Sequence, residues 1–92
     1  SPVFKIMELV AAEGAQVVTV DPHVDRFYDH HGHEFRTTPL SDDVLHSADC
    51  VVILTNHRAF DYVHIVREAA VVVDTRNATR DVRDGRDKIV LL

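Results

Sequence analysis

The strongest constraint on the fold lies in residues 71–77, whose sequence is Val-Val-Val-Asp-Thr-Arg-Asn. The consecutive valines predict a strand buried on both faces, which is typical of a parallel sheet covered by helices. The polar residues that follow begin at Asp74, where the strand should end. Ligands of open α/β sheets bind in the crevice at the carboxyl ends of the strands. Arg76 is therefore a candidate ligand contact, because its planar guanidinium can donate two parallel hydrogen bonds to an anion such as a phosphate.

The rest of the chain alternates between helical and extended patterns. A helix is predicted over residues 2–13, with Ser1 as its cap and Gly14 at its end, and Ser41 is the predicted cap of a second, short helix. A third helix is predicted over residues 60–70, and its expected buried side comprises Phe60, Val63, Ile65 and Val66. Strands are predicted over residues 16–20, 34–37, 50–54, 71–73 and 88–92. This alternation predicts a layered α/β fold with a mainly parallel sheet.

Length, charge and cysteine content narrow the class of protein. A chain of 92 residues forms one domain at most. A formal net charge of −5 argues against nonspecific nucleic-acid binding, which needs a basic face. The sequence contains no apolar run of transmembrane length and no signal peptide, so a cytoplasmic location without membrane contact is expected. Because the chain opens on Ser1 rather than methionine, we expect a piece of a longer protein.

Four segments, spread over nearly the whole chain, carry a family resemblance. They are residues 1–6 (SPVFKI), 17–24 (VVTVDPHV), 48–60 (ADCVVILTNHRAF) and 74–77 (DTRN). In order and spacing they resemble the helix start, the first strand end, the second strand and the closing Asp-x-Arg-Asn signature of the C-terminal, UDP-binding domain of the UDP-glucose/GDP-mannose dehydrogenase family. The sequence of residues 73–80 most resembles that of family members that oxidise UDP-N-acetyl amino sugars.

This resemblance implies a three-layer α/β/α domain with a mainly parallel, Rossmann-like sheet that lacks the family's first strand. Residues 1–92 would form the C-terminal UDP-sugar-binding domain of a longer enzyme. In the family the missing strand runs through the middle of the sheet, so we expect a gap there. A partner chain, residues 88–92 or an upstream segment would cover that gap, because buried unpaired backbone groups are costly.

The resemblance also implies an activity for the intact enzyme. It would be an NAD-dependent UDP-sugar 6-dehydrogenase of polysaccharide biosynthesis, which oxidises the C6 hydroxyl of a UDP-hexose to a uronate. This chain would supply Arg76 as a substrate-binding residue and no catalytic residue, and it would act with N-terminal and central domains in a homo-oligomer. NAD would be bound mainly by those domains, because this chain has no Gly-x-Gly-x-x-Gly fingerprint. The chain alone is expected to be inactive.

The candidate residues also have structural interpretations. Arg76 could pair at the surface with Asp74 or Asp81. Thr55 or Asn56 could cap the helix that follows them, and we favour this over an anion site at that helix start. His57 matches a histidine of the family motif, but no chemistry is assigned to it.

The sequence predicts neither a metal site nor a nucleophile. The histidine-rich loop, defined as His23, His30, His31 and His33, lacks the ordered ligand spacing of tight zinc sites. Cys50 is the only cysteine, so an internal disulfide is excluded. At the head of an apolar strand it is expected to behave as a small apolar residue, since nothing nearby would lower its pKa.

A competing hypothesis is a stand-alone receiver-like or protein-interaction domain with the same layered fold. A receiver needs a phosphorylatable aspartate after a central strand. Asp21 could belong to an acidic cluster, but Leu54-Thr55 ends the candidate central strand without an aspartate. The dehydrogenase domain is therefore the preferred hypothesis, and a Rossmann fingerprint upstream in the gene would decide between the two.

Overall fold

The structure is a computed structural model that describes residues 2–20, 26–28, 34–36 and 40–92. Its helices are α1 (Pro2–Ala12), α2 (Asp42–Ser47) and α3 (Tyr62–Glu68), with a short 3₁₀ helix at Arg86–Lys88. Its strands are β1 (Val17–Val20), β2 (Arg26–Tyr28), β3 (Glu34–Arg36), β4 (Cys50–Ile53), β5 (Val72–Asp74) and β6 (Ile89–Leu91). The predicted cap at Ser1, the strand end at Asp21 and the histidine-rich loop lie outside the described residues.

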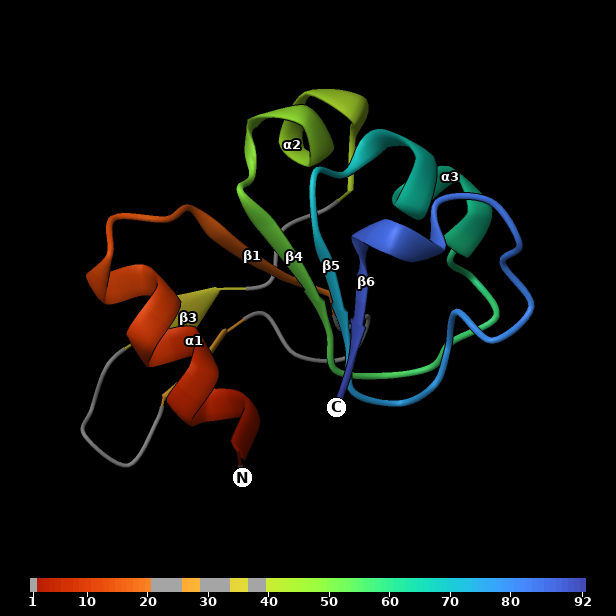
Figure 1. The fold of residues 1–92 in the computed structure, drawn as a ribbon. Helices are drawn as coiled ribbons and strands as arrows, with labels where there is room; N and C mark the ends of the chain where they lie inside the picture. The colour runs from red at the N-terminus through yellow and green to blue at the C-terminus, as the bar shows by residue number, and fades with distance from the viewer. Residues whose placement is uncertain (1, 21–25, 29–33, 37–39) are drawn as a thin grey trace.

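Within the described residues, a parallel sheet has the strand order β1-β4-β5-β6, and β2 pairs with β3 in a separate antiparallel hairpin (Figure 1). The prediction of a gap in the middle of the sheet is wrong, because β1 pairs directly with β4, with Val18 opposite Val51. This pairing satisfies the backbone groups that a gap would have left open. The strand at β2 was not predicted, whereas β3 lies within the predicted segment 34–37.

Helices cover both faces of this sheet, so the predicted three-layer α/β/α arrangement is confirmed (Figure 1). On one face Leu45 of α2 and Val66 of α3 pack against Val51 and Val72 of the sheet. On the other face Met7 of α1 packs with Val52 and neighbouring strand residues. The alternating valines of β4 and β5 therefore serve two cores at once, which explains why these strands are apolar at successive positions.

Helix α3 is shorter than predicted and presents a different face to the core. Asp61 caps this helix, because its Oδ1 atom accepts a hydrogen bond from the His64 N–H at 3.1 Å. Ile65 and Val66 are buried as predicted, but Val63 is 57% exposed. The predicted cap by Thr55 or Asn56 is therefore wrong. At α2 the prediction is confirmed, since Ser41 Oγ accepts from the Val44 N–H at 3.2 Å.

The segment between β5 and β6 is partly buried and ends in a tight turn. Ala78, Thr79 and Val82 are buried beneath its charged surface. Gly85 has a φ of 83°, and a Cβ atom added to it would lie 2.9 Å from Val66 Cγ1. The turn therefore approaches α3 at a distance that only glycine allows.

Candidate functional site

The carboxyl ends of the parallel strands bring the candidate residues to one edge of the sheet. Backbone hydrogen bonds continue past the strand ends, from the Leu54 N–H to the Val20 carbonyl at 3.4 Å and from the Thr75 N–H to the Ile53 carbonyl at 3.2 Å. The Thr75 hydroxyl also donates to the Ile53 carbonyl at 2.7 Å. The loop after β4 and the loop after β5, which carries Arg76, are therefore neighbours at the edge where α/β sheets bind ligands.

Asp74 organises the loop that carries Arg76. The Asp74 side chain is fully buried, and one of its oxygens accepts hydrogen bonds from the Arg76 and Ala78 N–H groups, both at 3.0 Å. The other oxygen accepts from the Thr79 N–H at 2.8 Å and from the Thr79 hydroxyl at 2.6 Å. Asn77, with a φ of 54°, reverses the chain inside this turn. The backbone at Arg76 is thus fixed by a buried carboxylate.

The same hydrogen bonds keep Asp74 ionised. Burial alone raises the pKa of a carboxyl group, but the donors from Thr79, Arg76 and Ala78 outweigh it and hold the pKa of Asp74 below its ordinary value of 3.8. A buried carboxylate that accepts several N–H and O–H hydrogen bonds stays charged and locks the groups that donate to it. Asp74 is therefore a structural anchor of the loop.

Arg76 is exposed to solvent. Within the described residues its guanidinium forms no ion pair with Asp74 or Asp81. The predicted alternative of a surface ion pair is therefore not found, because Asp74 is occupied by the loop. A rigid backbone that presents an uncompensated guanidinium at the edge of the sheet can bind an anionic ligand.

The loop after β4 is held by Tyr62, a residue that lies in none of the motifs recognised in the sequence. The Tyr62 hydroxyl accepts a hydrogen bond from the His57 N–H at 2.8 Å and lies 3.3 Å from the Thr55 carbonyl oxygen, to which it can donate. The His57 ring turns back on its own loop, because its Nδ1 atom accepts from the Ala59 N–H at 3.0 Å. This loop therefore forms a fixed wall beside the candidate edge.

Cys50 is a core residue, as predicted. It is buried at the start of β4, and burial, reinforced by the nearby charge of Asp49, raises the pKa of its thiol. A protonated thiol is a poor nucleophile.

A second group of polar side chains, also missed in the sequence, lies between α2 and α3. It comprises Asp42, His46, His64 and Glu68. The available signal was the spacing of four residues within each helix, which places two side chains on one helix face.

Comparison with known proteins gives one family and two curated relatives. A model of the "UDP-glucose/GDP-mannose dehydrogenase family, UDP binding domain" matches residues 1–81. The UDP-N-acetyl-D-mannosamine dehydrogenase of Methanococcus vannielii is 29% identical over 85 residues, which cover 84% of this chain and 18% of the relative. The enzyme of the same name from Methanococcus maripaludis is 32% identical over 85 residues, with the same coverage of 84% and 18%.

The chain thus spans about a fifth of the length of these relatives, or 18%. No solved structure matches the chain with statistical significance. Among the described residues, every helix is too short or too polar to cross a membrane.

Proposed function

Because the chain belongs to the UDP-glucose/GDP-mannose dehydrogenase family, as its UDP binding domain, we propose that it binds the UDP-sugar substrate of an NAD-dependent UDP-sugar 6-dehydrogenase. The relatives that it resembles bear the name UDP-N-acetyl-D-mannosamine dehydrogenase, so the proposed substrate is a UDP-N-acetyl amino sugar. The family assignment does not favour the alternative of a stand-alone receiver-like or interaction domain.

The observation that carries the proposal is the exposed Arg76 at the carboxyl edge of the sheet, on a loop fixed by Asp74. Its role is to donate hydrogen bonds to the anionic UDP-sugar. The charge of Arg76 offsets ligand charge without first breaking an ion pair to Asp74 or Asp81, and the fixed backbone limits the entropy lost on binding.

The chemical step belongs to other parts of the intact enzyme. The overall reaction in this proposal converts the C6 hydroxyl of the sugar to a carboxylate, with NAD as the oxidant. The residues of this chain do not fit a dinucleotide site, because its glycines, Gly14, Gly32 and Gly85, are far apart in sequence. The intact enzyme is proposed to be a cytoplasmic homo-oligomer of polysaccharide biosynthesis, in which N-terminal and central domains bind NAD and supply the nucleophile.

Substrate choice tests this proposal directly. The intact enzyme is expected to oxidise UDP-N-acetyl-D-mannosamine in preference to GDP-mannose, and UDP alone is expected to compete with the substrate. The measurement is NADH formation with each sugar nucleotide at matched concentrations, followed by inhibition with UDP and with GDP. Preferential oxidation of GDP-mannose, or equal competition by GDP, would contradict the proposal.

The isolated chain of residues 1–92 is expected to show no dehydrogenase activity. It has no glycine fingerprint for NAD, and its single cysteine is a buried core residue. The purified chain is incubated with NAD and UDP-N-acetyl-D-mannosamine, and NADH is measured against a control without protein. NADH formation above that control would refute the proposal that the other domains bind NAD and supply the nucleophile.

A further inference from the structure

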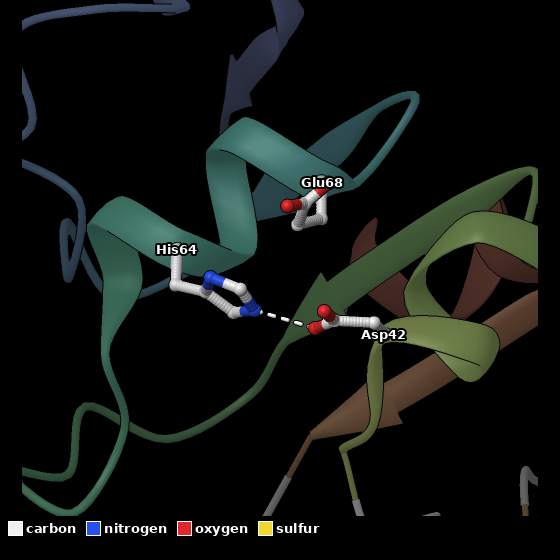
Figure 2. Close-up of side chains that lie close together, drawn as sticks. All are labelled: Asp42, His64 and Glu68. Atoms are coloured by element: carbon white, nitrogen blue, oxygen red, sulfur yellow. Dashed lines mark hydrogen bonds and ion pairs between the residues drawn. The ribbon is translucent and has the colours of Figure 1, made fainter.

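Two helices that pack side by side each present a pair of metal-ligand side chains to the other. Helix α2 carries Asp42 and His46, and helix α3 carries His64 and Glu68. In each pair the residues are one helical turn apart, so both side chains lie on the same face. Figure 2 shows the His64 ring directed at the Asp42 carboxylate across the space between the helices, with Glu68 beside them.

The ligand atoms are close enough to share one ion. His64 Nε2 lies 2.6 Å from Asp42 Oδ1, and His46 Nε2 lies 2.9 Å from Glu68 Oε2. Ligand atoms of Asp42, His64 and Glu68 all lie within 4.8 Å of one another. A tetrahedral zinc ion with bonds of about 2.0–2.2 Å needs its ligands roughly 3.4 Å apart. Small side-chain rotations on these solvent-facing helices would bring the atoms to that spacing.

The charges of the group also suit a cation. Hydrogen bonding to His64 lowers the pKa of Asp42, and hydrogen bonding to His46 lowers the pKa of Glu68, so both carboxylates are ionised at neutral pH. A divalent cation binds imidazole in its neutral form and carboxylate in its ionised form, so this set of side chains can supply both kinds of ligand.

We propose that the α2–α3 cluster, defined as Asp42, His46, His64 and Glu68, is a binding site for a zinc-like divalent cation. Asp42, His64 and Glu68 are the primary ligands, and His46 lies beside them, with its Nε2 atom 2.9 Å from Glu68 Oε2. The mixture of imidazole and carboxylate ligands favours zinc over magnesium or calcium, which prefer oxygen ligands alone. The ion would link α2 to α3 on the outside of the core that these two helices form with the sheet.

The contact between Arg67 and His64 offers a way to tell a metal site from a set of surface ion pairs. Its Nη2 atom lies 2.8 Å from His64 Nδ1, which leaves the ring proton on Nε2, facing Asp42. A metal bound at Nε2 moves that proton to Nδ1, which can then no longer accept a hydrogen bond from Arg67. Arg67 therefore opposes the metal, whereas in a set of ion pairs it would only add to the network.

The experiment is a calorimetric titration of the chain of residues 1–92 with zinc chloride, repeated with cobalt(II) to record the absorption of a tetrahedral site. One zinc ion per chain is expected to bind. His64→Ala should weaken binding by more than roughly tenfold, since the loss of even an outer-shell partner costs 10–100-fold. Arg67→Gln should strengthen binding severalfold, because it removes a positive charge beside His64 and leaves Nδ1 free to carry the ring proton.

The matched control is the double variant His31→Ala, His33→Ala in the histidine-rich loop, which should bind zinc like the wild-type chain. Asp42→Asn is a second test in which an exposed ligand is changed, so that a folding defect of His64→Ala, monitored by circular dichroism, does not decide the outcome. Absence of zinc binding would overturn the proposal. So would binding that Asp42→Asn leaves unchanged, or binding that the loop variant abolishes.

Discussion

Arg76→Ala in the intact enzyme is expected to weaken UDP-sugar binding by about tenfold to over a hundredfold, because a charged hydrogen bond to a ligand contributes roughly 1.5–3 kcal/mol. The guanidinium stands exposed at the carboxyl edge of the sheet, and its backbone is held by Asp74 at 3.0 Å. Removal of the side chain should therefore leave the loop folded. The measurement is a substrate titration together with a thermal melt of each variant.

Three further variants sharpen this prediction. Arg76→Lys should recover only part of the affinity, because an ammonium group lacks the planar, two-pronged donor geometry. Arg80 and Arg83 are exposed on the same charged segment, so Arg80→Ala and Arg83→Ala should change binding little. The Arg80 guanidinium donates to the Asn77 carbonyl at 3.3 Å. If Arg76→Ala binds and turns over substrate like the wild type while it remains folded, this edge is not the substrate site.

Asp74→Ala is expected to lower the free energy of unfolding by about 3–5 kcal/mol, because it leaves several buried N–H and O–H donors without an acceptor. This is a large part of the stability of a small domain, which is about 5–15 kcal/mol. Urea unfolding of the chain measures the change. The matched control is Asp81→Ala, an exposed aspartate on the same segment, which should stay within about 0.5 kcal/mol of the wild type. Equal stabilities of the two variants would contradict the anchoring role of Asp74.

The effect of Asp74 should also depend on pH in a defined direction. Its folded-state pKa is held below the ordinary value of 3.8, so the ionised form is favoured in the folded chain. The contribution is fully present above that ordinary value and is lost as the pH falls through the lower, folded-state pKa. The difference in stability between wild type and Asp74→Ala should therefore be constant near neutrality and shrink in strong acid. A difference that grows on acidification would show the opposite shift.

Most of the main sheet could be predicted from the sequence because its central strands are apolar at successive positions. The runs at Cys50–Ile53 and Val72–Asp74 are buried on both faces, and burial of this kind leaves a direct mark on composition. The strand at Arg26–Tyr28 has no such run of apolar residues, because it is short and, among the described residues, pairs with β3 in a hairpin. Strand neighbours were harder still, because nothing in the local pattern of β1 states that it pairs with β4.

The sequence predicted where Arg76 lies in the fold, but not what holds its loop in place. The position of Arg76 followed from the end of an apolar run, which marks the carboxyl edge of a strand. The role of Asp74 could not be seen, because it depends on Thr79 folding back onto the carboxylate over a separation of five residues. The cluster between α2 and α3 was missed for a similar reason. Its spacing within each helix is visible in the sequence, but the pairing of His64 with Asp42 depends on how the helices pack.

The close approach of Gly85 to Val66 has a consequence for how this sequence can vary. A side chain at position 85 would meet the buried Val66 methyl at 2.9 Å and would also have to adopt a φ of 83°. Shortening Val66 would remove the first obstacle but not the second, which costs roughly 1–2 kcal/mol for residues other than glycine. A side chain at position 85 would therefore be tolerated only if the conformation of the turn and the residue at position 66 both changed. Positions 66 and 85, which are 19 apart in the chain, thus constrain one another.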